Sequence, residues 1–483
     1  MLNQLKTKYC CLPLPVKASL WFFVCAFLQK AISAITVPIF TRLMTSSEFG
    51  AYNVFLSWQS LVNCIVTLNL YGGFYTQGLT KFQDKRDKFS ASLQGLTIAM
   101  VATWTVVYLV LREPVNRLFD ITTVQMLYMF LSIWAMASFS FWSVEQRVQY
   151  RYKKLVIITA VSAVCIPLVG ILAVLFGTDK VTSRIAATAV ASVVCYAGLC
   201  FAQLQKGKCV FSKEYWPYAL GFAVPLVPHY LSQIVLSNSD RIMISNIVDS
   251  SAAGIYSLAY QIAQIMMLFN TALLQTIEPW IYKRIQKDEI EQIQGIAFPL
   301  FVFVSIVNLL LIAFAPEVVR IFAPVEYHGA IWVIPPIAMS VVFMFQYSFF
   351  ALFEFYYEKT THIALATMAG AVLNVLLNYV FIRKYGYYAA GYTTLICYMV
   401  YVLVHYCFMK GICKRYHSGK KPYNGKLLIG FSCAFLLLGF GLLLTYQYFV
   451  LRVCLLLIFV TAALVNRKQI ICYVKHLASI RKK

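Results

Sequence analysis

Charged residues are scarce in this chain. Only 12% of the 483 residues are Asp, Glu, Lys or Arg, whereas 61% are hydrophobic, and the mean hydropathy is +0.72. A soluble protein of this length needs a much larger polar surface. The composition therefore excludes a soluble globular protein and predicts an integral membrane protein.

Several motifs of enzyme chemistry are also missing. The sequence contains no GxxxxGK[ST] phosphate loop, which argues against direct use of ATP, and it has neither a DxD nor an HExxH motif. Membrane glycosyltransferases and polymerases commonly carry a large outer loop, but the longest outer connection expected here covers only 316–328. We therefore expect a protein that is not an enzyme and needs no cofactor; a membrane glycosyltransferase or polymerase is a disfavoured alternative.

The cysteines give no sign of a metal or disulfide framework. The fourteen cysteines are scattered, mostly within apolar runs, and no CxxC pair occurs. Cysteine in such surroundings behaves as a small apolar packing residue. No metal site is expected.

Long apolar runs recur from one end of the chain to the other. A run of about 20 residues is long enough to cross a bilayer as a helix. We predict an all-α polytopic membrane protein with about fourteen transmembrane helices: 16–41, 49–72, 89–111, 123–144, 153–176, 183–205, 215–239, 252–279, 291–315, 329–353, 360–382, 389–410, 426–447 and 450–466.

The basic residues indicate the orientation. Lys and Arg number 41 against 18 acidic residues, for a formal net charge of +23. In the fourteen-span arrangement they are about threefold more frequent in the connections on the side of both termini, which is the positive-inside pattern. We expect both termini in the cytoplasm and contacts with anionic membrane lipids, and no binding of nucleic acid.

One short pattern occurs twice. Thr41-Arg42-Leu43-Met44 precedes Gly50-Ala51-Tyr52, and Asp240-Arg241-Ile242-Met243 precedes Gly254-Ile255-Tyr256. Each copy lies where one apolar run ends and the next begins, near the start of each half. Such repeats indicate two bundles related by pseudo-symmetry, the arrangement in which many secondary transporters build a central site.

Polar residues are concentrated in four spans. Spans one and two begin the first half and spans seven and eight begin the second. The helical stripes are Gln29, Ser33 and Thr36 beside Lys30; Gln59, Asn63 and Thr67; His229, Gln233, Ser237 and Arg241 beside Asp240; and Tyr256, Tyr260, Gln261, Gln264, Gln275 and Glu278.

For most of these residues, hydrogen bonding between packed helices is an equally good explanation. Lys30 is different, because a lysine near the middle of the bilayer costs about 2.5–3.5 kcal/mol and normally faces water or a partner. Arg42 and Arg241 lie near the outer interface, where their side chains could instead snorkel, and Asp240 could pair locally with Arg241. Glu145, Glu278 and Glu354 are expected as ordinary interface charges, although Glu278 could pair with a base in the cavity.

A cavity holding Lys30, Arg42 and Arg241 against one acid, Asp240, favours an anion. A pyrophosphate between a lipid and a sugar fits that charge, because ammonium and guanidinium groups bind phosphate oxygens well. The amide stripes could bond sugar hydroxyls, and Tyr256 and Tyr260 could stack on sugar rings. Candidate proton carriers are Asp240, Glu278 and His229. Pro225 and Pro228 break the helical hydrogen-bond ladder and predict a hinge in the seventh span.

The chain resembles the Wzx-type oligosaccharide flippases, which share a superfamily with the multidrug/cation antiporters and the lipid II flippase. The likeness covers nearly the whole chain and rests on four patterns in order. They are Arg42 with Glu48, Gly50 and Tyr52; Asn69 to Gly73 followed by 81–86; Asp240 and Arg241 followed by Gly254 and Tyr256; and Asn374 and Asn378 followed by Gly386 and Gly391. The chain departs from the family in having Tyr387, Tyr388 and Tyr392 where small residues are usual.

The resemblance implies two six-helix lobes with spans one, two, seven and eight around a central cavity. The corresponding division is 1–205 (first lobe), 206–214 (linker), 215–411 (second lobe) and 412–483 (spans thirteen and fourteen and a basic tail). It implies a flippase in the bacterial inner membrane that moves an undecaprenyl-pyrophosphate-linked repeat unit for O-antigen or capsule synthesis, with a polysaccharide polymerase and a chain-length regulator as partners. A drug/cation antiporter and a lipid II flippase are the alternatives.

Overall fold

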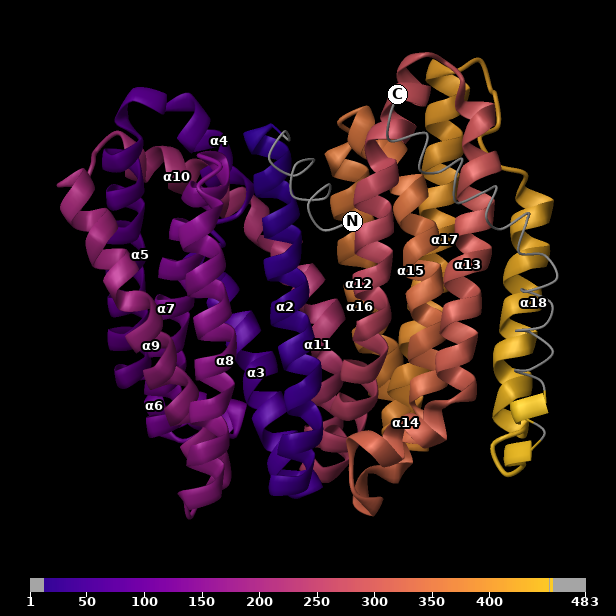
Figure 1. Cartoon of the computed structure of the whole chain (residues 1–483), viewed down its shortest axis with the longest axis horizontal. Helices are drawn as coiled ribbons and strands as arrows, with labels where there is room; N and C mark the ends of the chain where they lie inside the picture. The colour runs from indigo at the N-terminus through magenta and orange to yellow at the C-terminus, as the bar shows by residue number, and fades with distance from the viewer. Residues whose placement is uncertain (1–12, 451, 455–483) are drawn as a thin grey trace, which may run out of the picture. The chain divides into compact units, whose positions relative to one another are not determined.

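The computed structural model describes residues 13–450 and 452–454, and every regular element in this part of the chain is a helix (Figure 1). Twelve helical segments within it are long and apolar enough to cross a membrane. This confirms the prediction of an all-helical, multi-pass membrane protein.

The chain divides into two compact units, Met1–Ile242 and Met243–Lys483. The helices of the first unit are α2 (Leu14–Leu43), α3 (Ser46–Thr67), α4 (Gly73–Lys81), η1 (Gln83–Lys85), α5 (Arg86–Val110), α6 (Arg112–Phe119), α7 (Thr123–Val148), α8 (Tyr152–Phe176), α9 (Lys180–Gly207), α10 (Tyr215–Ala223), η2 (Val224–Leu226) and most of α11 (Val227–Ile247). Those of the second are α12 (Ser250–Gln286), η3 (Ile290–Gln292), α13 (Ile293–Ala313), α14 (Ala315–Phe322), η4 (Val325–Trp332), α15 (Ile334–Tyr356), α16 (Thr360–Tyr385), α17 (Tyr388–Tyr416) and α18 (Gly425–Leu444).

Two of the fourteen predicted spans have no counterpart among the twelve apolar segments. The second, 49–72, corresponds to α3, which is helical but is not among the twelve apolar segments. Its amides Asn53, Gln59 and Asn63 lower its hydropathy. The last, 450–466, falls almost entirely outside the described residues. The count of fourteen therefore stays a prediction.

The division at residue 242 differs from the predicted linker at 206–214 because α10 packs inside the first unit. Tyr215, Ala219 and Ala223 of α10 enter an aromatic core with Phe74 of α4 and Phe89 of α5. This packing attaches the beginning of the predicted second lobe to the first unit. The lobe assignment as a whole stays a prediction.

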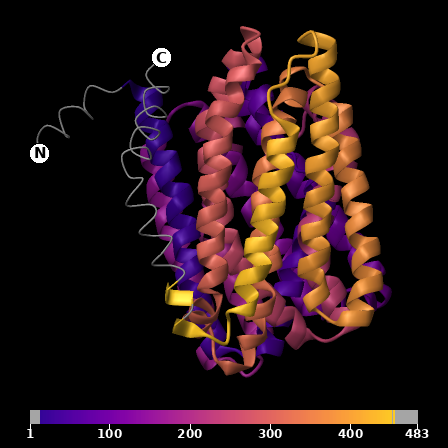
Figure 2. The ribbon, with the colours of Figure 1, turned by 90° about the vertical axis from the view of Figure 1, so that its right-hand side faces the viewer.

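In the first unit, α9 is the central helix and packs against α5, α7 and α8, while α2 lies against α8. In the second unit, α15 has this role and packs against α12, α13 and α17. The additional helix α18 contacts α13 and α15 along the outside of the second unit (Figure 2). Tyr392 of α17 stacks on Phe440 of α18 with ring centroids 6.3 Å apart, so one of the unusual tyrosines packs against the added helix.

Local chemistry explains several helix ends. The hydroxyl of Thr45 accepts a hydrogen bond from the Glu48 amide at 3.3 Å, and the Glu48 carboxylate accepts one from the Thr45 amide at 2.8 Å. This is a capping box, so the acidic residue of the first pattern starts α3. The break expected from Pro225 and Pro228 coincides with η2, where the helix tightens into a single 3₁₀ turn. A hinge motion there stays a prediction.

Two glycines of the fourth pattern are required by geometry. Gly386 ends α16 with φ of +70°, a left-handed conformation that favours glycine. Gly391 lies at the start of α17, where an added Cβ would come within 2.9 Å of Pro336 in α15. These glycines set the turn and the close packing of α15 with α17.

Candidate functional site

The predicted stripe of the first span lies on an accessible face of α2. Gln29, Lys30 and Ser33 are exposed, and Thr36 is half-buried, with its hydroxyl donating to the Ser33 carbonyl at 2.9 Å. Arg42, near the end of the same helix, is exposed and donates to the Pro38 carbonyl at 2.8 Å. Among the described residues, polar and cationic groups therefore line an exposed face of α2.

Two residues of the second span's stripe, Asn63 and Thr67, form hydrogen bonds within their own unit. Asn63 on α3 is half-buried and its amide donates to the Tyr71 hydroxyl at 2.8 Å, while Thr67 donates to the Asn63 carbonyl at 2.7 Å. These bonds hold the end of α3 against the following turn. Hydrogen bonding between packed segments was one of the two expected roles of Asn63, and its role in a cavity stays a prediction.

The α11 stripe divides into an accessible and a buried part. His229 is half-buried and Gln233 is exposed, with Nε2 atoms 3.3 Å apart. Asp240 and Arg241 are buried, at 1% and 7% exposure, and Arg241 donates to the Ser237 carbonyl and to the Asn238 side chain. The structure thus places His229 and Gln233 together at an accessible surface and holds Asp240 and Arg241 in the interior.

The α12 residues belong to the second unit. Tyr256 and Tyr260 are buried with ring centroids 6.2 Å apart, so the pair packs in the interior. Gln264 and Glu278 are half-buried further along the helix, and Glu278 lies beside the Tyr282 hydroxyl. Of these four residues, Gln264 and Glu278 are the more accessible.

The first Gly-x-Tyr pattern forms an aromatic cage. The guanidinium carbon of Arg184 on α9 lies 3.4 Å from the centroid of Phe40 and 3.6 Å from that of Tyr52. A cation between two aromatic faces is stabilised by their quadrupoles, and the effect is larger where water is excluded. Arg184 is only 9% exposed. Tyr52 therefore joins α2, α3 and α9, and Gly50 is buried two residues before Tyr52.

The two asparagines of the fourth pattern form a buried bond chain. Asn378 donates to the Asn374 side chain at 3.2 Å, and the Thr393 hydroxyl of α17 donates to the Asn378 side-chain oxygen. Both asparagines are fully buried. They connect α16 to α17, which explains their spacing of four residues on one helix face.

Sequence reasoning missed a buried carboxylate in each unit. In the first, Glu145 of α7 is 4% exposed and accepts hydrogen bonds from Gln203 at 2.5 Å and Gln149 at 3.2 Å. Gln94 of α5 donates in turn to the Gln203 side chain at 2.7 Å. Three helices, α5, α7 and α9, are thus connected by one polar network.

In the second unit, Glu354 of α15 is fully buried, and one of its oxygens lies 2.7 Å from Nδ1 of His405 on α17. Both carboxylates had been expected to be ordinary interface charges. The sequence held a signal for this pair, because spans four and ten occupy the same position in the two halves and each is followed directly by a glutamate. Among the described residues, no group of His, Cys, Asp and Glu could hold a metal ion.

A model of the family described as "Polysaccharide biosynthesis protein" matches residues 16–285 of the chain. A curated relative, "Lsg locus putative protein 1" of Haemophilus influenzae, is 26% identical over 165 residues, which are 33% of this chain and 40% of the relative. The match thus spans well under half of that relative's length.

Solved structures share the fold. "Lipid II flippase MurJ, inward closed conformation" superimposes with a TM-score of 0.74 at 14% identity, covering 93% of this chain and 99% of that one. An outward-facing multidrug resistance MATE family transporter of the MOP superfamily gives a TM-score of 0.58 at 12% identity, covering 84% and 97%. At these identities the likeness shows the fold alone.

Proposed function

The chain belongs to the polysaccharide biosynthesis protein family, and from this premise we propose that it moves a polyprenyl-pyrophosphate-linked oligosaccharide across the bacterial inner membrane. The repeat unit enters from the cytoplasmic leaflet and leaves in the outer one by alternating access. The process is transport and breaks no covalent bond. Both termini lie in the cytoplasm, in keeping with the distribution of Lys and Arg.

The observation that carries this proposal is the exposed polar face of α2. Lys30 lies in the middle of a 30-residue apolar helix and its side chain is exposed, beside exposed Gln29 and Ser33. An ammonium group facing hydrocarbon at that depth would be strongly disfavoured, so a hydrated surface is the physically favourable environment for this face. Gln233 on α11 offers a second exposed amide.

The chemistry of these groups suits a phosphorylated sugar headgroup. Lys30 and Arg42 are cations that can hold pyrophosphate oxygens, and Gln29, Gln233 and His229 can bond sugar hydroxyls. The polyprenyl chain remains in the bilayer, so the protein needs to shelter only the polar headgroup. A polysaccharide polymerase and a chain-length regulator are the partners that such a product implies.

The proposal is tested with Lys30→Ala in cells that export the polysaccharide. Loss of surface polysaccharide, with the variant still inserted in the membrane, is the expected result. Lys30→Arg keeps the charge and should retain much of the export. Lys426→Ala, at an exposed position at the start of α18, is the matched control and should export normally. Full export by Lys30→Ala would remove Lys30 from the transport path.

The alternatives are a lipid II flippase and a drug/cation antiporter, whose fold this chain shares. The transported substrate distinguishes these alternatives from the proposed function. In proteoliposomes, the proposal expects flipping of a polyprenyl-pyrophosphate-linked oligosaccharide and no uptake of cationic dyes. Transport restricted to lipid II, or proton-coupled movement of organic cations, would assign the chain to one of the alternatives.

A further inference from the structure

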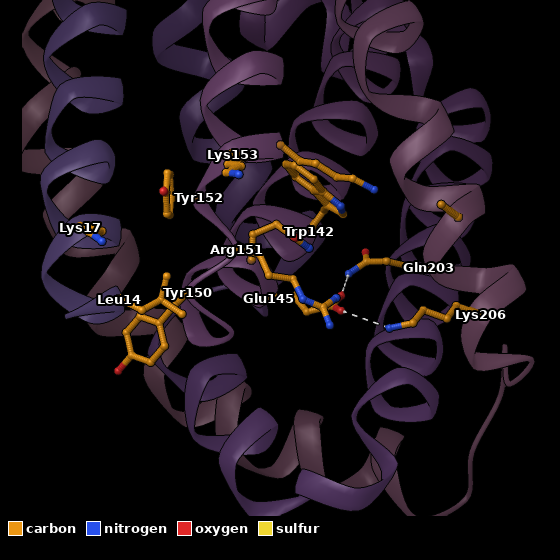
Figure 3. Close-up of a pocket in the computed structure, with 13 residues that line it drawn as sticks. Leu14, Lys17, Trp142, Glu145, Tyr150, Arg151, Tyr152, Lys153, Gln203 and Lys206 are labelled. Carbon is orange, nitrogen blue, oxygen red and sulfur yellow. Dashed lines mark hydrogen bonds and ion pairs between the residues drawn. The ribbon is translucent and has the colours of Figure 1, made fainter. Parts of the chain in front are cut away.

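A basic pocket opens at one end of the first unit, away from the polar stripes. It has a volume of about 740 Å³ and is lined by the first turn of α2 and by the facing ends of α7, α8 and α9. Figure 3 shows Lys17 and Tyr152 on one side, Gln203 and Lys206 on the other, and Trp142, Arg151 and Glu145 between them. We call this hollow the basic pocket.

The pocket wall carries five cations and one acid. The cations are Lys17, Arg151, Lys153, Lys154 and Lys206, and the acid is Glu145. Lys206 is engaged, because its ammonium lies 2.5 Å from Asp87 and 3.9 Å from Glu145. Within the part of the chain that the structure describes, Arg151, Lys153 and Lys154 form no ion pair, and all three are exposed. The hollow therefore has an uncompensated positive charge.

The floor of the pocket is fixed. Glu145 is held by Gln203 and Gln149, so its charge stays within the polar network of α7 and α9. On the opposite side, Tyr152 stacks on Trp21 of α2 with ring centroids 6.3 Å apart. These contacts hold the ends of the surrounding helices in place and keep the pocket open.

The positive-inside count assigns the connection between α7 and α8 to the cytoplasmic face, at the level of the lipid headgroups. Dispersed lysines at that level need no further explanation. Here, however, the three unpaired cations fall within four residues and face a preformed hollow with an aromatic wall, Trp142 and Tyr152. Basic pockets between transmembrane helices on this side bind anionic headgroups.

We propose that the basic pocket binds the phosphate group of a lipid headgroup from the cytoplasmic leaflet. The ligand is either an anionic phospholipid or the pyrophosphate of a polyprenyl-linked saccharide, which share the phosphate oxygens that the cations recognise. Arg151 can engage two oxygens at once, whereas Lys153 and Lys154 act as point charges. This site is distinct from the α2 face to which the transport path is assigned.

The test is native mass spectrometry of the full-length protein in detergent. The added probes are phosphatidylglycerol, phosphatidylcholine, a polyprenyl pyrophosphate and inorganic pyrophosphate. We expect the wild type to retain phosphatidylglycerol or polyprenyl pyrophosphate well above phosphatidylcholine. Lys153→Gln/Lys154→Gln should weaken that binding about fivefold for each cation removed. The lipid whose retention falls identifies the source of the phosphate.

The matched control is Lys85→Gln/Lys88→Gln, which removes two exposed lysines of the same unit that are not among the residues lining the pocket. It should change lipid retention less than twofold, an order-of-magnitude expectation. A second variant, Ala202→Trp, fills the pocket and keeps every charge, so it should lower retention as well. Thermal melting of each variant confirms that the protein is folded.

Equal losses in the two lysine pairs would reduce the effect to general surface charge and overturn the proposal. Unchanged lipid binding by Ala202→Trp would show that the lipid does not occupy the pocket, and it would also overturn the proposal. If inorganic pyrophosphate bound as tightly as the lipids, the ligand of the basic pocket would be a soluble phosphate compound. The proposal of a lipid headgroup would then be overturned. Because the readout is binding, a failure here leaves the Lys30 export test unaffected, and the reverse also holds.

Discussion

The carboxylate of Glu354 and Nδ1 of His405 lie 2.7 Å apart in the interior of the second unit. Their side chains are 0% and 2% exposed, and the ring of Tyr347 stacks on the imidazole with centroids 5.1 Å apart. The pair connects α15 to α17, the two most intimately packed helices of that unit. Glu145 and Gln203 connect α7 to α9 in the first unit in the same way.

Removing the imidazole should destabilise the second unit. In His405→Ala, Glu354 keeps its burial but loses its hydrogen-bond partner, which costs about 1–3 kcal/mol and more if the carboxyl is charged. His405→Gln can still donate to the carboxylate and should lose less. Thermal melting of the detergent-purified variants measures both. An Ala variant as stable as the wild type would show that the pair contributes nothing to stability.

Arg184 gives a second prediction, because its guanidinium is enclosed by Phe40 and Tyr52. Arg184→Ala should lower stability by about 2 kcal/mol or more, since the cation–π contacts are shielded from water. Tyr52→Phe keeps the ring face and should be near neutral, whereas Tyr52→Leu should approach the Arg184 variant. Melting temperatures in one detergent report these differences. Equal stability of the Phe and Leu variants would argue that side-chain volume, and not the aromatic face, matters at position 52.

Hydropathy alone predicted the long apolar helices of the part of the chain that the structure describes. A helix that crosses the bilayer must be a long apolar run, so the first span could be placed at 16–41 and was found at Leu14–Leu43. The proline pair located the break before α11 for a similar reason, since proline removes a backbone donor wherever it occurs. Such features depend on local sequence and can be read from it.

Partners that meet only through packing could not be predicted. Glu354 and His405 are separated by 51 positions, and nothing in either local sequence reveals the other. The sequence did not single out Arg184, because the cage formed by Phe40 and Tyr52 depends on how α9 packs against α2 and α3. The assignment of Lys30 and the other polar residues to a transport path remains a prediction from the polar pattern. The exposure of Gln29, Lys30 and Ser33 on α2 supports it.

Asp288 gives a prediction about pH. It lies in the connection after α12, where Lys420 donates to its carboxylate and Nδ1 of His417 lies 2.5 Å from Oδ1. The Lys420 hydrogen bond, followed by that of His417, holds the pKa of Asp288 below its ordinary value of 3.8. A carboxyl with a lowered folded pKa stabilises the protein above its unfolded pKa, and this contribution is lost as the pH falls through the folded one.

We therefore expect Asp288→Asn to melt below the wild type at neutral pH. The difference should be constant down to about pH 4 and then shrink as the pH is lowered further. Melting curves of both proteins at a series of pH values give this difference directly. A difference that grew toward acidic pH would mean that another group dominates the connection.

Single cysteines introduced on α2 and α11 test whether the exposed polar faces are hydrated. Gln29→Cys, Ser33→Cys and Gln233→Cys should react with a membrane-impermeant maleimide in inverted vesicles or intact cells, because a thiol must ionise in water to react. Val194→Cys and Leu437→Cys, at exposed apolar positions, are the lipid-facing controls and should react far more slowly.

Native cysteines set the background, so the increase in labelling over the wild type is the quantity to compare. Adding the lipid-linked substrate should protect positions 29 and 33 if their face lines the transport path, and should leave the two controls unchanged. Reactivity at positions 29, 33 and 233 as low as at 194 and 437 would place these polar faces in hydrocarbon. Since Lys30 could not remain charged in such surroundings without a large energetic penalty, the proposed transport path along α2 would then have to be abandoned.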